Sequence, residues 1–336
     1  MTAGGKGQSG GSDALDGVSV VVPVRDEAGS IARLLGALAR QTLLPAEVVV
    51  ADGGSTDATR DLVREFAARA PFPVVLAEAG PALPGRGRNV GIARASREWV
   101  ACVDAGTVPR EGWLEELVKA ARAAPEALVV FGQYEAKADS FFTRSAAAVY
   151  VPPPGEPVRS TASLLLHRSA WERAGRFRED LRSAEDLLFF RHLDAAGVAA
   201  VHAPRAAVEW ELRPTLASTF RKFTTYSRNN MRAGLAREWQ FGVARFYLLM
   251  LTGALPGLVF WRPLLLLAPL ALLLRGARRL WRWHPPGTGT ARRLASLFNL
   301  PRLLMVTWVN LVIDAATFYG LFQWFIHDHT GLPEEE

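Results

Sequence analysis

The chain of 336 residues contains a single cysteine, Cys102, and therefore cannot form an internal disulfide. Cys102 lies in the apolar run Trp99–Val103, where a buried strand is expected, so we do not expect a catalytic thiol. Residues 1–17, MTAGGKGQSGGSDALDG, lack the apolar segment of a secretory signal. We therefore predict a disordered polar leader over 1–17, followed by a domain that stays in the cytoplasm.

The sequence also lacks internal repeats and an excess of acidic residues. It has 39 Lys and Arg against 33 Asp and Glu, a formal net charge of +6 and 49% hydrophobic residues. The hydrophobic content excludes disorder of the whole chain. The positive charge suits anionic partners in general, including nucleic acid, lipid headgroups and sugar nucleotides, and does not choose between them.

From Val18 onward, short apolar segments alternate with amphipathic ones. This alternation predicts an α/β fold: a Rossmann-like, mostly parallel central sheet flanked by helices. We expect strands over 18–24, 47–51, 74–77, 99–104, 129–134, 162–167, 198–203 and 207–211. We expect helices over 30–41, 57–70, 87–95, 111–123, 168–174, 185–196 and about 215–234. The side chain of Ser55 or Thr56 is expected to cap the second of these helices.

Long apolar runs occur only after residue 245. Phe246–Leu274 is apolar apart from Arg262, and it is longer than one membrane span of about 20 residues but shorter than two. A tight hairpin and a kinked single span both fit. The next segment, RGARRLWRWHPPGTGTARR, is rich in arginine and aromatic residues, as expected at a cytoplasmic membrane surface, and this favours the hairpin.

The last apolar run, Leu303–Ile326, contains Asn310 and Asp314. A charge in the middle of a membrane costs about 2.5–3.5 kcal/mol on insertion scales, so this run either lies in the interface or packs against the hairpin. We predict membrane-anchoring helices over 241–330, in a multi-pass or hairpin arrangement. The alternative is a set of buried core helices.

Polar residues follow the first two predicted strands, in VSVVVPVRDEAGSI and EVVVADGGSTDAT. Ligands of open α/β sheets bind at the carboxyl ends of the strands. Asp52 can accept a hydrogen bond from a base N–H or a ribose hydroxyl, and Gly53 allows close approach of the backbone. The residues after the first strand that are placed to touch a base or ribose are Pro23, Val24, Arg25 and Glu27.

Three further segments carry candidate functional residues. GRGRNVG has neither the GxGxxG spacing nor a following GK[ST], which disfavours a dinucleotide or P-loop site. Glu185 and Asp186 begin a predicted helix, whose N-terminus favours ionised carboxylates. In FRKFTTYSRNNMRAG, Arg221, Arg228 and Arg232 can share one helix face, suited to diphosphate or to anionic lipid.

In order, VVPVRDEAGSI, VVVADGGSTDAT, GRGRNVGIARASREWVACVDAG and a later AED resemble the inverting family 2 glycosyltransferases of GT-A fold. The resemblance covers about residues 18–235. It implies a nucleotide-sugar-binding half over 18–134 and an acceptor-side half over 135–240. It further implies a nucleotide-diphospho-sugar donor, a divalent cation, and inversion at the anomeric carbon in a single displacement.

By this resemblance Asp52 contacts the base, and Arg88 and Asn89 approach the diphosphate or sugar of the donor. Asp186 is the catalytic base, and Glu185 orients the acceptor or the donor sugar. The remaining residues implied to bind the donor are Pro23, Val24, Arg25, Glu27, Gly53, Asp104 and Arg228.

The implied cation is Mg²⁺ or Mn²⁺, held by Asp104. The family has an Asp-x-Asp pair at this point, whereas the chain reads Asp104-Ala105-Gly106, which leaves metal dependence open. Glu209 is the expected substitute ligand, with Glu211 as an alternative.

The resemblance predicts transfer of a sugar to a hydroxyl of a lipid-linked or envelope glycan acceptor at the cytoplasmic membrane face. Membrane lipids are the other expected partner, and nucleic acid is not expected. Two alternatives stay open. One is a polyprenyl-phosphate glycosyltransferase, whose acceptor needs less help from Asp186 and more from Arg228. The other is a non-catalytic membrane scaffold that retains the fold.

Overall fold

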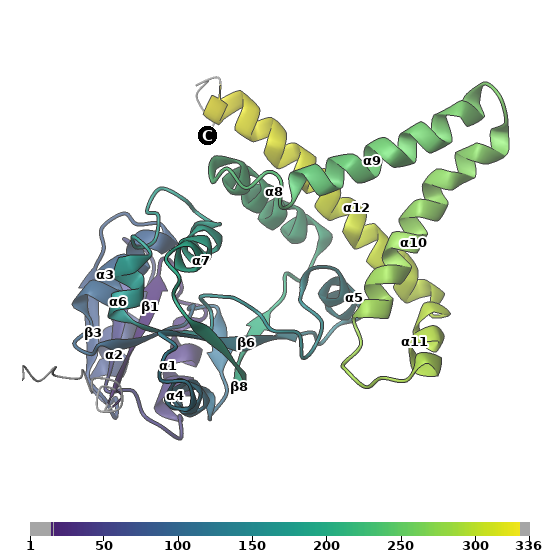
Figure 1. Ribbon diagram of the computed structural model, residues 1–336. Helices are drawn as coiled ribbons and strands as arrows, with labels where there is room; N and C mark the ends of the chain where they lie inside the picture. Colours follow the sequence, from purple (N-terminus) through teal and green to yellow (C-terminus); the bar gives the residue numbers. More distant parts are fainter. Residues whose placement is uncertain (1–14, 16, 330–336) are drawn as a thin grey trace, which may run out of the picture. The chain divides into compact units, whose positions relative to one another are not determined.

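The computed structural model describes Leu15 and residues 17–329, so most of the predicted leader over 1–17 lies outside the described residues. The chain divides into two compact units (Figure 1). The first comprises the described residues up to Tyr134 together with 157–180 and 185–210. The second comprises 135–156, 181–184 and the described residues from Glu211 onward.

An eight-stranded mixed sheet forms the centre of the first unit, in the order β3-β2-β1-β4-β7-β6-β8-β5. The strands β3, β2, β1 and β4 are parallel, whereas the β4–β7, β7–β6 and β8–β5 pairs are antiparallel. The predicted fold class is confirmed, with the parallel part confined to one side of the sheet. The strands are β1 Val18–Val24, β2 Glu47–Asp52, β3 Val74–Glu78, β4 Trp99–Cys102, β5 Thr107–Pro109, β6 Val129–Lys137, β7 Leu164–His167 and β8 Ala200–Glu211.

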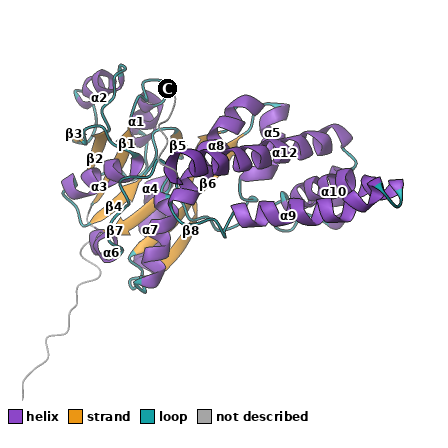
Figure 2. Ribbon diagram, turned by 90° about the horizontal axis from the view of Figure 1, so that it is seen from above, coloured by secondary structure: helices purple, strands orange, loops and turns teal. Residues whose placement is uncertain are grey.

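Helices cover both faces of this sheet (Figure 2). Alternate residues of β1 point to opposite sides, so Val20 and Val22 join the core beneath α1, α2 and α4, and Val21 joins the core beneath α3, α6 and α7. Each fully buried valine contributes roughly 1.5–3 kcal/mol. The helices are α1 Ile31–Ala39, α2 Thr59–Ala67, α3 Pro84–Arg94, α4 Trp113–Ala123, α6 Arg168–Arg173 and α7 Glu185–Ala195.

The predicted cap of α2 is wrong. The helix begins at Thr59 after Ala58, and its first N–H donates to the Asp57 carboxylate at 3.0 Å rather than to Ser55 or Thr56. Ser55 instead accepts a hydrogen bond from the backbone N–H of Asp26 at 2.9 Å, and the Thr56 N–H donates to the Asp26 carboxylate at 2.8 Å. The two polar residues therefore connect the loop after β2 to the loop after β1, a long-range use that local sequence does not reveal.

The second unit is helical. Its helices are α5 Phe141–Tyr150, α8 Leu216–Arg232, α9 Gln240–Ala254, η2 Leu255–Leu258, η3 Arg262–Leu266, α10 Leu267–Arg282, α11 Thr290–Leu297, α12 Leu300–Gln323 and the terminal turn η4 Trp324–His329. The chain reverses direction between α9 and α10 (Figure 1), so the hairpin alternative describes its path and the kinked single helix does not. Among Leu15 and residues 17–329, two helical segments are long and apolar enough to cross a membrane: Gln240–Leu258 and Leu300–His329.

A buried ion pair joins three helices of this unit. Asp314 of α12 accepts hydrogen bonds from Arg275 of α10, one of them at 3.0 Å, and from the Tyr247 hydroxyl of α9 at 2.9 Å. The Asp314 carboxylate thus has a cation and a phenol as partners, which compensates the charge noted in the sequence.

Candidate active site at the carboxyl edge of the sheet

The carboxyl ends of β1, β2 and β4 bring predicted site residues to one edge of the sheet. Val24 of β1 pairs in register with Asp52 of β2, and Val21 pairs with Cys102 of β4, two residues before Asp104. Because neighbouring strands lie about 4.8 Å apart, Asp52 and Asp104 flank β1 at a separation of about 10 Å. Both therefore border the crevice where open α/β sheets bind their ligands.

The loops after β1 and β2 hold each other by reciprocal hydrogen bonds. Besides the two contacts of Asp26, the N–H of Glu27 donates to the Thr59 hydroxyl at 2.8 Å, and the N–H of Ala28 donates to Asp57 at 3.0 Å. Asp26 has φ of 54°, a left-handed conformation that is uncommon outside glycine. The predicted donor-binding loop, which includes the exposed Arg25, is therefore held in one shape before any ligand arrives.

Asp52 is buried beside two donors. Its carboxylate accepts from the N–H of Ser55 at 3.2 and 3.3 Å, and Arg60 lies 3.7 Å from it. Arg60 was not predicted from the sequence; it immediately follows the motif, eight residues after Asp52. A Cβ added at Gly53 would lie 2.9 Å from the carbonyl oxygen of Ala82, so this glycine is needed for chain packing as well as for backbone access.

The glycines of GRGRNVG allow α3 to pack closely. A Cβ at Gly85 would lie 1.9 Å from the carbonyl oxygen of Arg178, and one at Gly91 would lie 2.4 Å from Val21. The segment is a helix whose small residues contact the sheet and a neighbouring loop. The disfavoured phosphate-loop alternative therefore does not describe it.

Arg88 connects residues from three parts of the sequence. Its buried guanidinium donates to Glu185 at 2.6 Å and to Asp104 at 2.7 Å, across 97 and 16 residues of chain. Burial would lower the pKa of Arg88, but the neighbouring Asp104, Glu185 and Asp186 raise it, so the guanidinium stays charged. Four predicted site residues thus form one group, the Arg88 cluster: Arg88, Asp104, Glu185 and Asp186.

The acidic pair at the start of α7 is electrostatically strained. Burial raises the pKa of Glu185 to about 7, Asp186 adds to the shift and Arg88 opposes it. The pKa of the half-buried Asp186 is also raised by burial; Arg88 lowers it and Asp104 raises it again. A carboxylate with a raised pKa is a stronger base than one in water. Ala184, just before the pair, has φ of 69°, a non-glycine strain of the kind often found at functional sites.

Asn89 uses its whole amide within the protein. Its oxygen accepts from the Trp171 indole and from the Phe177 N–H, both at 3.0 Å. Its nitrogen donates to the Phe177 carbonyl at 2.8 Å and to Glu179 at 2.9 Å. This side chain holds the loop after α6 against α3, next to the Arg88 cluster.

Tyr134, which the charge of Asp186 reaches, and its neighbour Trp210 were not predicted as site residues. Tyr134 of β6 packs edge-on against Trp210 of β8, with ring centroids 5.7 Å apart. Burial, together with the charge of Asp186, raises the pKa of Tyr134 to about 12. Only the aromatic residues at the ends of two predicted strands could have signalled this pair.

The remaining predicted residues are less closely connected to the cluster. Glu209 lies on β8, opposite Val108 of β5. Over Leu15 and 17–329, no group of three or more His, Cys, Asp or Glu side chains is arranged to hold a metal ion. Arg228 belongs to the second unit, where it binds Asp328 through two hydrogen bonds at 2.7 and 3.0 Å.

Comparison with known proteins identifies relatives of this arrangement. The chain is 38% identical over 117 residues to validoxylamine A glucosyltransferase of Streptomyces hygroscopicus subsp. jinggangensis. This match covers 34% of the chain and 28% of that protein. The chain is also 29% identical over 211 residues to pre-mycofactocin glycosyltransferase of Mycobacterium tuberculosis. This match covers 59% of the chain and 43% of that protein. The matches thus span less than half the length of either relative.

A solved structure shares the fold. The mannosyltransferase PcManGT from Pyrobaculum calidifontis, in complex with GDP-Man and Mn²⁺, superimposes with a TM-score of 0.56 at 20% identity, covering 92% of this chain and 86% of that one. The family model described as "Glycosyl transferase family 2" matches residues 19–197. These residues include the two hydrogen-bonded loops after β1 and β2 and the whole Arg88 cluster. Because this match extends over more than half of the chain, the predicted family is confirmed: the chain belongs to glycosyl transferase family 2.

Proposed function

We propose that the chain transfers a sugar, with inversion, from a nucleotide-diphospho-sugar to an acceptor hydroxyl, and that Asp186 is the base. The Arg88 cluster carries this proposal. It joins an acidic pair of raised pKa to Asp104 at the strand edge where the donor is expected. In a single displacement the acceptor oxygen attacks the anomeric carbon, the bond to the diphosphate breaks, and the acceptor proton passes to Asp186.

On the donor side, the hydrogen-bonded loops after β1 and β2 would bind the nucleoside together with Asp52. The other residues around the nucleoside would be Pro23, Val24, Arg25, Glu27 and Gly53. Asp52 would accept from the base, and Arg60 beside it could donate to the base. Since the loops are already held by hydrogen bonds, binding would lose little conformational freedom.

Asp104 is the residue best suited to hold Mg²⁺ or Mn²⁺, because its carboxylate is 39% exposed while one oxygen binds Arg88. The three carboxylates of the cluster exceed the single guanidinium, and a doubly negative diphosphate would add to this excess. A bound cation would neutralise the leaving diphosphate. Glu209 remains the proposed second ligand.

Glu185 and Asn89 are better explained as positioning residues. Glu185 is almost fully buried and accepts a hydrogen bond from Arg88, so it would hold the Arg88 guanidinium in position. Its charge would also raise the basicity of Asp186. Asn89 would fix the loop that precedes α7. Arg228 binds Asp328, which lends no support to the polyprenyl-phosphate alternative.

The rings of Tyr134 and Trp210 would provide a surface against which the acceptor packs. Aromatic rings present flat apolar faces with polar edges, which suits the faces of a sugar ring. Tyr134 is close enough to Asp186 for the charge of Asp186 to act on it. We propose an acceptor that includes a sugar or another polyhydroxyl group and is carried on a lipid or an envelope glycan at the cytoplasmic face. Membrane attachment rests on the exposed apolar residues of the α9–α10 hairpin.

A donor panel tests the proposal. The full-length chain is incubated with UDP-, GDP- and dTDP-sugars, with Mn²⁺, with Mg²⁺ or with a chelator, and nucleotide release and donor binding are measured. We expect one donor to bind and to be consumed, faster with the cation. Absence of both binding and release under every condition would favour the scaffold alternative.

A further inference from the structure

Helix α12 and the turn after it carry a continuous apolar stripe on one face. Its members are spaced alternately four and three residues apart, so they line up along a single side of the helix. Most are exposed, and four of the seven are aromatic. The aromatic stripe comprises Leu304, Trp308, Leu311, Ala315, Phe318, Phe322 and Phe325.

The opposite face of α12 is attached to the polar helix α8. The Ser227 hydroxyl of α8 donates to the carbonyl oxygen of Thr317 at 2.8 Å. A Cβ at Gly320 would lie 2.5 Å from the carbonyl oxygen of Thr224, so the two backbones are nearly in contact. Near the end of the segment, Asp328 pairs with Arg228. Crossing a membrane would therefore require α12 either to leave α8 or to take its charged residues into the hydrocarbon.

The centre of the segment is also polar. Asp314 lies midway between Leu300 and His329 and is only 1% exposed. Its partner Arg275 belongs to α10, and Asn310 is buried one turn earlier. In a crossing helix these groups would lie at the middle of the bilayer, where charge is least favourable. At the membrane surface they would lie at headgroup depth.

The α9–α10 hairpin supplies a second apolar surface. The residues that lead into its tip are its most exposed apolar part, with Phe260 at 83%, and the exposed Arg262 follows them at the tip. The apolar stretch Phe246–Val259 spans about 20 Å at 1.5 Å per residue, less than the roughly 30 Å of a hydrocarbon core. Arginines occupy both ends of the hairpin base, at Arg245 and at Arg275–Arg282, as expected beside anionic headgroups.

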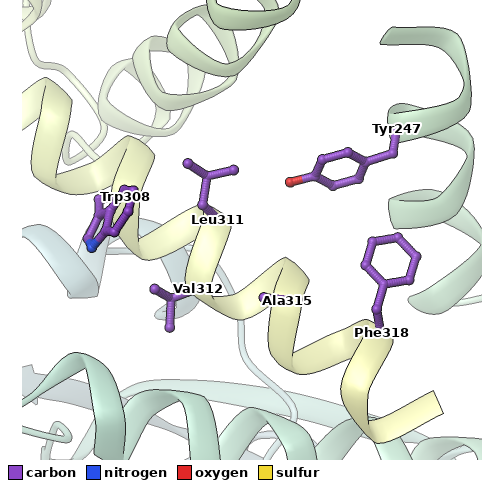
Figure 3. A pocket seen from close by; sticks show the side chains of 6 residues that line it. All are labelled: Tyr247, Trp308, Leu311, Val312, Ala315 and Phe318. Atoms are coloured by element: carbon purple, nitrogen blue, oxygen red, sulfur yellow. The ribbon is translucent and has the colours of Figure 1, made fainter. Parts of the chain in front are cut away.

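A groove connects the hairpin to the aromatic stripe. It has a volume of about 460 Å³ and lies between α9 and α12. Tyr247 lines it from α9, and four members of the stripe line it from α12 (Figure 3): Trp308, Leu311, Ala315 and Phe318. The two apolar surfaces are therefore continuous.

We infer that α12 does not cross the membrane but lies in the plane of its surface, with the aromatic stripe against the acyl chains of anionic phospholipids. The α9–α10 hairpin enters the bilayer from the same side, and its apolar stretch is too short to reach the opposite surface. Both ends of the second unit then remain on one side of the bilayer. This inference rests on the proposed membrane location and goes beyond it, because that location is equally compatible with a crossing helix.

Depth measurements along the stripe test this geometry. Spin labels are placed one at a time by Leu304→Cys, Leu311→Cys, Phe318→Cys and Phe325→Cys in the full-length chain. Each label is about 10.5 Å from the next along one face. Cys102 can stay, because it is fully buried and burial raises the pKa of its thiol to about 12. Arg221→Cys on the exposed side of α8 is the control for a water-facing position. The chain is bound to vesicles of phosphatidylglycerol and phosphatidylethanolamine.

We expect all four stripe labels to lie at similar depth, within about one helix pitch of 5.4 Å, and Arg221→Cys to stay in water. A depth that rises to a maximum between 311 and 318 and falls again would show a crossing helix and overturn the inference, while the membrane location would stand. Concentration-dependent coupling between labels, with no oxygen access, would mean that a second copy covers the stripe, and would also overturn it. A chain that does not sediment with the vesicles would refute the membrane location itself.

Discussion

Each unit contains an arginine bound to carboxylates, and the two groups differ in charge balance. In the first unit, Arg88 binds Asp104 and Glu185, with Asp186 close by, so one guanidinium faces three carboxylates. In the second unit, Arg275 and the Tyr247 hydroxyl both bind Asp314, so one guanidinium faces one carboxylate. The hydrogen-bonded charges of the second group balance, whereas the first keeps negative charge that only a ligand or a proton can neutralise.

This difference bears on which group we propose to take part in catalysis. A balanced buried ion pair adds little net stability, because desolvation offsets the attraction. In the unbalanced group, burial first and the neighbouring carboxylates second raise the pKa of Glu185 and Asp186, and a raised pKa makes a carboxylate a stronger base. This supports our proposal that the Arg88 cluster takes part in catalysis, whereas the Asp314 pair joins α9, α10 and α12.

The largest effect is expected from Arg88→Met. It leaves three acidic groups without a cation, so we expect the free energy of unfolding to fall by about 3–5 kcal/mol, as for other broken buried pairs. Urea unfolding followed by tryptophan fluorescence measures it. Arg159→Met is the matched control, because Arg159 binds Asp194 at the surface, and its loss should cost less than about 1 kcal/mol. Equal effects of the two variants would contradict the assignment.

A smaller loss is expected from Asp314→Asn. It leaves Arg275 and Tyr247 without their charged acceptor, but the Arg275 side chain is partly exposed and can reach water. We expect about 1–3 kcal/mol of lost stability in detergent. Transfer per folded molecule should change less than twofold. A transfer rate that falls much further than stability would bring Asp314 into the chemistry and break the comparison.

The pH dependence of transfer should move with Glu185→Gln. Asp186 must be ionised to accept a proton, so activity is lost as the pH falls through its raised pKa. Asp186 raises the pKa of Glu185, and the repulsion is mutual, so removing the Glu185 carboxyl should make ionisation of Asp186 easier and shift the acid limb of kcat/KM to lower pH.

Unfolding provides an independent readout of the same carboxyl. The pKa of Glu185 is raised from 4.5 to about 7 on folding, so its contribution to stability is present below about pH 4.5 and is lost as the pH rises through about 7. Glu185→Gln should flatten stability over this range. If Glu185→Gln left the acid limb of kcat/KM at the same pH, the proposed electrostatic coupling between Glu185 and Asp186 would be contradicted.

The smallest effect is expected from replacing the whole balanced group. The triple variant Asp314→Leu, Arg275→Met, Tyr247→Phe leaves no charge unpaired, so stability should stay within about 1 kcal/mol of the parent chain. Transfer should persist. Thermal unfolding and nucleotide release test both points, and loss of activity in a stable triple variant would speak against a purely structural group.

The sequence predicted those parts of the fold that depend on local pattern. The valines of β1 and β2 alternate in runs that only a buried strand accommodates, and both strands were placed to within one residue. The two separate strands expected over 198–203 and 207–211 are one strand, β8, because Pro204 does not interrupt it. Helix α5 was missed although Ser140 caps it, because its small side chains give weak periodicity.

The candidate site divides in the same way. The placement of Asp52, Asp104 and Asp186 at the ends of elements could be predicted, since each lies at or just after the end of a strand or at the start of a helix. Their roles in donor binding and catalysis stay predictions. The role of Arg88 could not, because its two partners lie 16 and 97 residues away and no local period relates them. Asn89 and Gly53 were predicted to touch the donor, yet both make close contacts within the protein that depend on chain packing.

The most direct test is the single-turnover rate of sugar transfer by Asp186→Asn, measured with the donor that the panel identifies. The same substitution at Asp194, exposed on the same helix α7, is the control. We predict unchanged donor affinity and a transfer rate about 10²–10⁴-fold lower for Asp186→Asn, with Asp194→Asn close to the parent chain. Transfer by Asp186→Asn at the parent rate would contradict the account.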